Sequence, residues 1–342
     1  MHPVDALRRT AFLLERSQAP AHRAGAFRRA ALVLAGLADD ELARRLREGT
    51  LTELAGIGPR TASVATAAAA GEVPAYLADL EAGSAPEPLE PAARALLGAL
   101  RGDLHAHTDW SDGGSPVEEM AATAAEIGHE YLAITDHSPR LRVANGLSSA
   151  RLEQQLDLLD RLREPLAPFV LLSGIEVDIT DDGGLDGDRD LLDRLDVVVA
   201  SVHSRLGGRS SAQAMTQRML AAVADPRVDV LGHCTGRLVT GDRGQRAEAP
   251  FGAAAVFAAC AERGVAVEVN SRPERLDPPR RLLRQAVEAG CLLSIDTDAH
   301  APGQLAWQHL GAARAAECGA SAEQVVDAWP LERLREWLRR AG

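Results

Sequence analysis

The chain has 342 residues, of which 46% are hydrophobic, and this length can bury two domains or one large barrel with an appendage. Its formal net charge of -12 argues against a protein that coats nucleic acid through a broadly basic surface. The sequence has no run of about 18 apolar residues, and its N-terminus lacks the apolar stretch of a signal peptide, which predicts a cytoplasmic protein without a membrane segment.

The first part of the chain predicts a small helical domain. Apolar residues recur at spacings of three and four over residues 4–16, 21–37 and 39–49, and we expect four or five short helices up to residue 80. Residues 1–80 carry ten Arg against nine Asp and Glu, a balance of +1 that leaves -13 for the rest. This local excess indicates either a surface that faces phosphate or ordinary solvated helix faces.

A boundary between two domains is predicted at the segment EAGSAPEPLEP, residues 81–91, which is rich in proline, glycine and acid. We therefore divide the chain into a helical domain at residues 1–82, a linker with a short helix at residues 83–100, and a second domain at residues 101–342.

The second domain alternates short apolar runs with amphipathic helices, which predicts a parallel α/β structure. The candidate strands are residues 103–107, 131–137, 169–178, 196–203, 229–233, 265–270 and 292–300. Every candidate except 265–270 carries a His, Asp or Glu at or just past its C-terminal end. Because α/β barrels gather their active sites at that end of the strands, a closed barrel is favoured over an open sheet.

A cluster of metal ligands is predicted at these strand ends. His105 and His107 are two residues apart on one strand, so both side chains lie on the same face and could chelate one ion. A His-x-His pair alone could also be structural. Six of the ten histidines, however, fall at strand ends, whereas the other four lie in helical or loop contexts and are expected at the surface or in the core. Those four are His2, His22, His129 and His309.

Cysteine ligands are not expected, because none of the four cysteines lies at a CxxC spacing and all read as reduced thiols. They are Cys234, Cys260, Cys291 and Cys318. Any metal must therefore be held by histidine and carboxylate.

Seven motifs in chain order resemble those of the PHP (polymerase and histidinol phosphatase) family of phosphoesterases. They are DLHAHTDWSDG, ITDHS, GIEVD, SVHS, GHCTGR, EVN and DTDAH, between residue 102 and about residue 305. The resemblance implies a distorted seven-stranded β/α barrel with three divalent ions. It implies one ion held by His105, His107, Glu176 and Asp298, a second by Glu176, His203 and His233 with Glu176 bridging, and a third by Asp112, His137 and His300.

The sequence departs from the common pattern of this family at two positions. Asp112 stands where some relatives have His, and Asp can still bind a metal. Cys234 stands where Pro is frequent, which predicts a thiol near the site and activity that is sensitive to oxidation.

The predicted ligand chemistry is hydrolytic. Mixed imidazole and carboxylate ligands suit Zn²⁺, Mn²⁺ or Fe²⁺ better than Mg²⁺ or Ca²⁺. Two ions about 3.5 to 4 Å apart lower the pKa of a shared water, so we expect a metal-bridging hydroxide as the nucleophile, with Glu176 central to catalysis. Arg205 and Arg237, and less clearly Arg275, are candidates for clamping the phosphate, although each could serve only in a loop ion pair.

Two further acidic residues near these motifs are expected to orient ligands without binding a metal themselves. Asp136 is beside His137, and Asp296 is near Asp298.

The N-terminal domain contains Gly56-Ile57-Gly58 between two helical segments, which resembles a helix-hairpin-helix motif. In such a motif, backbone N–H groups approach a DNA phosphate at a helix N-terminus, and Arg60 would add a point charge. The whole segment also resembles the small N-terminal domain of family X DNA polymerases, whose bacterial members carry a C-terminal PHP domain. A helical hairpin that serves only for packing is the alternative.

Two activities of family X polymerases are excluded. Only about twenty residues separate Leu80 from the first metal-ligand motif, which is too few for a polymerase palm. Removal of deoxyribose phosphate through a lysine Schiff base is excluded because all 37 basic residues are arginine.

The sequence thus predicts a metal-dependent hydrolase of phosphate esters. The leading interpretation is a phosphodiesterase acting on DNA as a 3′ exonuclease, in 3′-end processing or in abasic-site cleavage during repair, with the helical domain presenting the DNA. The alternative is a small-molecule phosphomonoesterase of the histidinol phosphatase type. A non-catalytic DNA-binding or scaffold protein is a third interpretation.

Overall fold

The computed structural model describes residues 1–84, 88–241 and 244–339. They form two compact units, the first comprising Met1–Pro88 with Pro302–Gln304 and the second Leu89–Ala301 with Leu305–Gly342. The centre of the predicted linker, residues 85–87, lies outside the described residues, and the rest of that linker contains helix α6 (Pro91–Ala99). In the described part of the chain, no helix combines the length and the apolar character that crossing a bilayer requires.

The first unit is helical. Its elements are α1 (Pro3–Arg16), α2 (Ala21–Ala35), α3 (Asp39–Glu48), a 3-10 turn (Leu51–Glu53), α4 (Pro59–Ala69) and α5 (Ala75–Gly83). Apolar faces of α1, α2 and α4 form one core that includes Leu7, Phe27 and Val64. A buried ion pair between Glu15 and Arg28, 2.7 Å apart, ties α1 to α2. The helices predicted for residues 4–16, 21–37 and 39–49 are confirmed to within two residues at each end.

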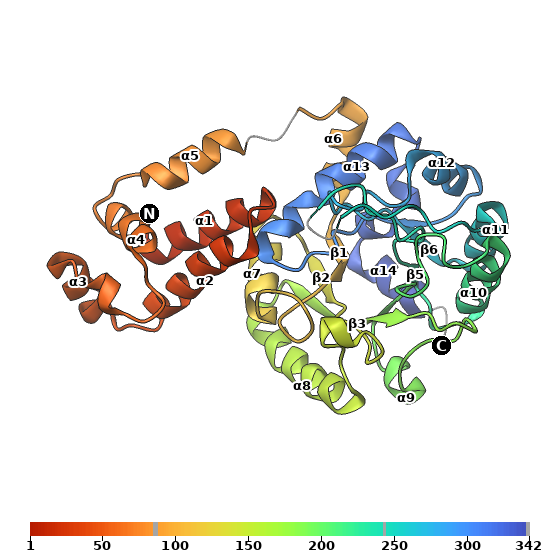
Figure 1. Ribbon diagram of the computed structural model, residues 1–342, viewed down its shortest axis with the longest axis horizontal. Coiled ribbons are helices and arrows are strands. Elements are labelled where there is room, and N and C mark those ends of the chain that lie inside the picture. Colours follow the sequence, from red (N-terminus) through yellow and green to blue (C-terminus); the bar gives the residue numbers. More distant parts are fainter. Residues whose placement is uncertain (85–87, 242–243, 340–342) are drawn as a thin grey trace. The chain divides into compact units, whose positions relative to one another are not determined.

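The second unit contains one parallel sheet of seven strands paired in sequence order (Figure 1). The strands are β1 (Gly102–Ala106), β2 (Tyr131–Ile134), β3 (Val170–Asp178), β4 (Val197–Ser201), β5 (Val230–Leu231), β6 (Ala266–Glu268) and β7 (Leu293–Ser294). The helices that connect or follow them are α7 (Val117–Glu126), α8 (Ser149–Leu166), α9 (Arg189–Leu192), α10 (Ala212–Ala224), α11 (Ala253–Arg263), α12 (Arg280–Glu288), α13 (Gln308–Glu317) and α14 (Leu331–Leu338). The predicted distorted β/α barrel is confirmed.

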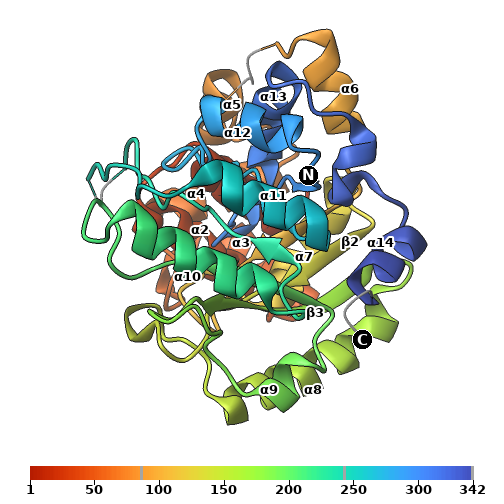
Figure 2. The ribbon, with the colours of Figure 1, turned by 90° about the vertical axis from the view of Figure 1, so that its right-hand side faces the viewer.

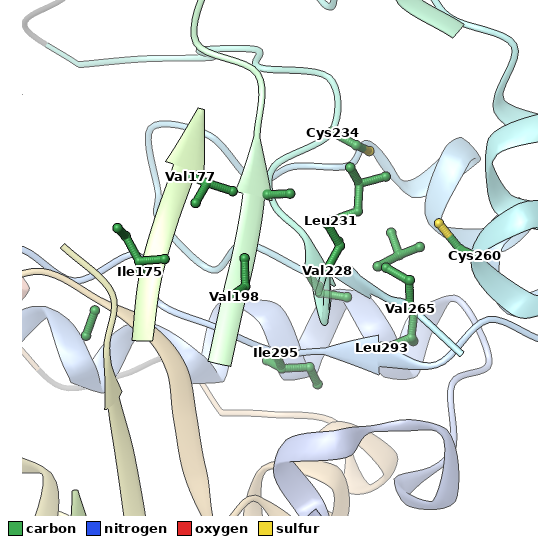
Figure 3. Packing of buried hydrophobic residues seen from close by; sticks show 14 of the residues in the cluster. Ile175, Val177, Val198, Val228, Leu231, Cys234, Cys260, Val265, Leu293 and Ile295 are labelled. Atoms are coloured by element: carbon green, nitrogen blue, oxygen red, sulfur yellow. The ribbon is translucent and has the colours of Figure 1, made fainter. Parts of the chain in front are cut away.

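The two faces of the strands bury different cores, because successive side chains on a strand point to opposite faces. Outward-facing residues such as Ile175, Val177 and Val198 pack in the large cluster shared with the surrounding helices (Figure 3). Inward-facing residues such as Val199 pack instead with Trp337 and its neighbours on α14. Figure 2 shows α14 close to β2 and β3, where it covers the end of the barrel at which the strands begin.

Side-chain carboxylates help to close the barrel between β7 and β1. The main-chain contact there is one parallel bridge between Ala106 and Ala299. Below that bridge, Asp296 accepts a hydrogen bond from the Leu104 N–H at 2.7 Å, and Asp103 accepts one from the Thr297 hydroxyl at 2.5 Å. Asp296 therefore joins the two edges of the sheet beside His105, and its role in orienting a metal ligand stays a prediction.

A third carboxylate, Asp327, completes this closure. The Ser294 hydroxyl lies 2.5 Å from Asp296 Oδ2 and 3.0 Å from Asp327 Oδ1, yet its single hydrogen can be donated to only one of them. Burial, reinforced by the negative charge of Asp103, raises the pKa of Asp327 well above its usual range. The Asp327 carboxyl therefore releases its proton at a higher pH in the folded protein than in the unfolded chain.

We predict that Asp327→Asn stabilises the protein at alkaline pH, because the amide can donate to Ser294 without a titrating proton. A carboxyl whose pKa is raised in the folded state contributes stability at low pH and loses it as pH rises above the unfolded value, here 3.8. The advantage of the variant should thus grow with pH, by about 1.4 kcal/mol per unit of pKa elevation. Chemical denaturation of both proteins at pH 5 and pH 8 measures it. An advantage of the same size at both values would contradict the prediction.

Candidate metal centre

The predicted ligands converge at the C-terminal ends of the strands. His105 lies in β1 and Glu176 in β3, while the others occupy the loops that follow β1, β2, β4, β5 and β7. Those loop residues are His107, Asp112, His137, His203, His233, Asp298 and His300. All nine side chains take part in close contacts with one another.

Glu176 lies at the centre of these contacts. Its Oε1 atom is 2.9 Å from His233 Nε2 and 3.3 Å from His203 Nε2. Its Oε2 atom is 2.7 Å from His137 Nδ1 and 3.5 Å from His105 Nε2. His107 Nε2 is also 3.7 Å from Oε2. The two oxygens of one carboxylate therefore face different sets of imidazoles, as a bridging ligand requires.

Potential ligand atoms gather in three overlapping groups, in each of which all atoms lie within 4.8 Å of one another. The groups are His105, His107 and Glu176; His137, Glu176 and His203; and His107, Asp112, His137 and His300. Asp298 Oδ1 is 3.4 Å from His107 Nε2 and so borders the first and third groups. Asp112, whose side chain is 34% exposed, forms the open edge of the centre.

Several buried polar atoms of this centre have no hydrogen-bond partner among the described residues. They include Glu176 Oε2, His137 Nδ1 and His203 Nε2. Glu176 Oε2 and His137 Nδ1 are only 2.7 Å apart and still do not form a hydrogen bond. A buried polar group without a partner costs about 1 to 3 kcal/mol, and a divalent cation would satisfy several of these atoms together. The residues present therefore fit a divalent metal ion.

Neighbouring charges set the ionisation of the ligands. Burial opposes the charged form of Glu176, but the cationic forms of His203 and His105 outweigh it and hold the pKa of Glu176 well below its usual range. Burial similarly opposes the charge on Asp298, and the Arg275 guanidinium more than offsets it, so the pKa of Asp298 is also well below its usual range. Both carboxylates are thus ionised, as metal ligation requires.

The histidines of the centre differ in ionisation. Burial, reinforced by nearby His137, lowers the pKa of His107 to about 3, so His107 is neutral. Burial also favours neutral His203, but the Glu176 carboxylate outweighs it and raises the pKa of His203 to about 9. A cation that binds to His203 must therefore displace a proton.

Two carboxylates that sequence reasoning did not select position the histidines. Glu268 in β6 lies 2.6 Å from His105 Nδ1 and also accepts a hydrogen bond from the His233 main chain, which leaves His105 Nε2 facing the centre. Asp178 accepts a hydrogen bond from the His203 N–H at 3.1 Å. The candidate strand at residues 265–270 was expected to carry no site residue. Glu268, an acidic residue within this short apolar strand, could have indicated a functional position.

Asp136 orients the loop that carries Asp112. Its carboxylate accepts hydrogen bonds from the Thr108 N–H at 2.8 Å, from the Ser111 hydroxyl and from Gln155 Nε2 at 2.7 Å. The Asp136 carboxylate thus holds the loop that carries Asp112, and the Asp136 carbonyl accepts a hydrogen bond from the Glu176 N–H at 3.1 Å.

The three arginines that were candidates for clamping the phosphate differ in how close they lie to the predicted metal ligands. Arg275 is buried and its Nε is 2.9 Å from Asp298 Oδ2. Arg237 donates to the carbonyls of Arg275 and Leu276, while Arg205 is 63% exposed and pairs with Asp181 at 3.0 Å. Of these three arginines, Arg275 directly contacts a predicted metal ligand, Asp298. A catalytic role for Arg205 or Arg237 stays a prediction.

The Cys234 thiol is buried. The residue is 2% exposed, and burial raises the pKa of its thiol well above the usual range. Oxidation proceeds through the thiolate, so this environment disfavours oxidation, and the sensitivity of the activity to oxidation stays a prediction.

The residues predicted to face DNA lie in the first unit, at the turn before α4. Gly56 has a left-handed φ of 90°, which glycine adopts without steric strain. Ile57 is buried and anchors the turn, whereas Gly58 and Arg60 are exposed. The Gly58 N–H donates to Thr61 Oγ1 at 3.0 Å, and Arg60 lies over the Tyr76 ring at 5.2 Å.

Comparison with known proteins identifies relatives of the second unit. A model of the PHP domain matches residues 103–272. A Bacillus subtilis (strain 168) protein named DNA polymerase/3′-5′ exonuclease PolX is 37% identical over 244 residues, which cover 71% of this chain and 42% of that protein. A probable phosphatase of Shewanella sediminis (strain HAW-EB3) is 31% identical over 205 residues, which cover 59% of this chain and 74% of the relative.

Among solved structures, the chain is similar to a histidinol phosphate phosphatase from Lactococcus lactis subsp. lactis Il1403, which was crystallised with zinc, L-histidinol and phosphate. The match has a TM-score of 0.47 and 16% identity, and covers 65% of this chain and 94% of that one.

We predict that Glu176→Gln lowers the number of metal ions retained per chain, because the amide keeps the shape of the side chain but removes the charge that five imidazoles face. Elemental analysis after dialysis against Zn²⁺ or Mn²⁺ measures the content. Glu130→Gln is the matched control, since Glu130 is 52% exposed and pairs with Arg101 across the surface. Equal metal content in both variants would show that Glu176 is not a ligand.

Proposed function

The chain belongs to the PHP domain family of metal-dependent phosphoesterases, and we propose that it hydrolyses phosphodiester bonds at the ends of DNA strands. Its reaction class is that of the family, the metal-dependent hydrolysis of phosphoester bonds. The DNA substrate is the proposed part. The proposal includes three possible reactions, which are 3′ exonuclease action, 3′-end processing and cleavage at abasic sites.

The main support for DNA as the substrate is the similarity to the Bacillus subtilis protein. That relative is named for a 3′-5′ exonuclease and is 37% identical, whereas the phosphatase from Shewanella sediminis is 31% identical. Because this chain spans 42% of the length of the Bacillus protein, its activity is proposed for the hydrolytic part alone.

The turn before α4 supports DNA as the substrate. A side chain added at Gly58 would meet no atom within 4 Å, so the backbone there is open to a large ligand. The N-terminus of α4 presents N–H groups at this point, where a phosphate is favoured by the helix dipole. Arg60 adds an exposed positive charge two residues further on.

The side chains of the centre have distinct tasks in this reaction. Glu176, with the histidines around it, would hold two ions, and Asp112 with His137 and His300 would hold a third; Zn²⁺, Mn²⁺ and Fe²⁺ fit this ligand chemistry. Such ions supply Lewis-acid stabilisation of the phosphate and lower the pKa of a bound water. Arg275 fixes one oxygen of Asp298, and Glu268 fixes the ring of His105, so neither ligand must reorganise during the reaction.

A small-molecule phosphomonoesterase is the second candidate. It is favoured by the match to the Shewanella sediminis protein, which is named a probable phosphatase and is covered over 74% of its length. The two candidates differ in whether the substrate phosphate carries one ester bond or two.

We predict that the Mn²⁺- or Zn²⁺-loaded protein shortens or trims end-labelled oligonucleotides and cleaves abasic duplexes faster than it hydrolyses a panel of phosphomonoesters. Glu176→Ala should lower both activities by roughly 100-fold or more, beyond the loss typical of residues that only support a ligand. Gel electrophoresis and phosphate release provide the two readouts. Turnover of monoesters with no change in any oligonucleotide would establish the second candidate instead.

We also predict that Gly58→Val weakens binding of an oligonucleotide by about tenfold, because the added side chain keeps a phosphate from the backbone. The fold should be unaffected, since there is open space at this position. Fluorescence anisotropy measures the affinity, and monoester hydrolysis should be unchanged. Gly98→Val is the control, because Gly98 in α6 also has open space around it. Equal affinities of the two variants would remove the role of this turn in DNA binding.

A further inference from the structure

A pocket of about 470 Å³ opens beside the metal centre in the second unit. His203, whose Nε2 is 3.3 Å from Glu176 Oε1, forms one of its walls. The volume is within the range of small-molecule sites, roughly 300 to 1,000 Å³, and His203 is the one described lining residue that also belongs to the three groups of ligands. The pocket, called here the arginine pocket, is lined by His203, Arg205, Leu206, Gly207, Arg209, Leu238, Gln245, Arg246 and Ala247.

The charge of the arginine pocket is positive. Arg205, Arg209 and Arg246 line it, and none of its described lining residues is acidic. Arg205 also pairs with Asp181, which is outside the lining, at 3.0 Å. Three guanidinium groups on a chain with a net charge of -12 make this a local site for an anion, and guanidinium groups suit phosphate oxygens in particular.

The pocket is built by the loop after β4 and the loop after β5. Within the second loop, Arg246 Nε donates to the Gly236 carbonyl at 2.6 Å, and Leu238 and Arg246 form an antiparallel bridge. Gly207 adopts a left-handed φ of 66°, and a Cβ there would lie 3.3 Å from Arg246 Cγ, so glycine allows the arginine stem to pack closely. Arg205 also has a left-handed φ of 56°. Non-glycine residues adopt this conformation rarely, and such residues cluster at active sites and ligand-binding sites.

The walls of the pocket are suited to more than an isolated anion. Leu206 and Leu238 provide apolar surface between the arginines, and Gln245 provides an amide. A phosphate with a single small ester group would be held at the metal centre and would leave this volume empty. A nucleoside that links two phosphates would fill it.

We propose that the arginine pocket binds the second phosphate of a strand end, together with the nucleoside that connects it to the phosphate at the metal centre. This inference rests on the proposed function and narrows its substrate to a chain end with at least two phosphates. The pocket thus selects a nucleotide chain over a monoester, while the metal ligands carry the bond cleavage.

The test is isothermal titration calorimetry of the metal-loaded protein with thymidine 3′,5′-bisphosphate and thymidine 5′-monophosphate. We expect the bisphosphate to bind about tenfold more tightly, as an added charge-assisted contact predicts. Arg209→Gln should remove most of that advantage and leave the affinity for the monophosphate unchanged. Arg194→Gln, at an exposed residue near Glu153, removes the same charge elsewhere and should change neither affinity.

A second variant tests the opposite wall. Arg246→Gln should cause the same selective loss of affinity for the bisphosphate, and a thermal melt distinguishes this from a disturbed loop, since Arg246 also binds the Gly236 carbonyl. Equal binding of the two nucleotides by the wild-type protein would overturn the proposal. So would a loss of both affinities together in Arg209→Gln, or pyrophosphate binding as tightly as the bisphosphate, which would indicate a site for free polyphosphate.

The proposed function is tested separately with bis(p-nitrophenyl) phosphate, a diester that has no second phosphate. Wild-type protein and Arg209→Gln should hydrolyse it at equal rates. If neither hydrolyses it, the phosphodiesterase proposal fails, while the calorimetric comparison still decides whether the pocket recognises a second phosphate.

Discussion

Glu176 carries a negative charge at a position where only 1% of the residue is exposed, and the arrangement of the second unit compensates that charge. An uncompensated buried carboxylate is strongly destabilising, so positive or polar groups must approach it from several directions. A barrel of parallel strands provides those directions, because successive strands end around one axis. The five imidazoles around Glu176 come from the ends of four different strands, so no single local segment could have produced the site.

The predicted ligands around this carboxylate are themselves contacted by further charged side chains. Arg275 faces Asp298, Glu268 faces His105, and Asp178 faces the main chain of His203. Each of these groups holds a predicted ligand in one orientation without itself approaching Glu176. The arrangement explains why the C-terminal ends of the strands contain so many ionisable side chains, whereas the strand beginnings are filled by apolar residues that pack on α14.

The seven strands and the helices of the first unit could be predicted because their signals are local, with a repeat of two or of three to four residues. The convergence of the metal ligands could be predicted from their common place at strand ends. The hydrogen-bond partners that lie across the barrel from one another could not be predicted. Glu268 is 163 residues from His105, and Asp103 is 194 residues from Thr297. No repeat or spacing in the sequence indicates such pairings, and for the same reason the contact between Arg275 and Asp298 could not be predicted.

The position of α14 has a consequence for the order in which the protein forms during translation. Trp337 and Leu338 pack with the starts of the strands, and Asp327 accepts a hydrogen bond from the Ile295 N–H, yet both segments are synthesised after all seven strands. Until they emerge from the ribosome, the interior of the barrel is open at that end and the junction between β7 and β1 is incomplete. During translation the chain therefore exposes apolar strand surface after all of its metal ligands have been synthesised.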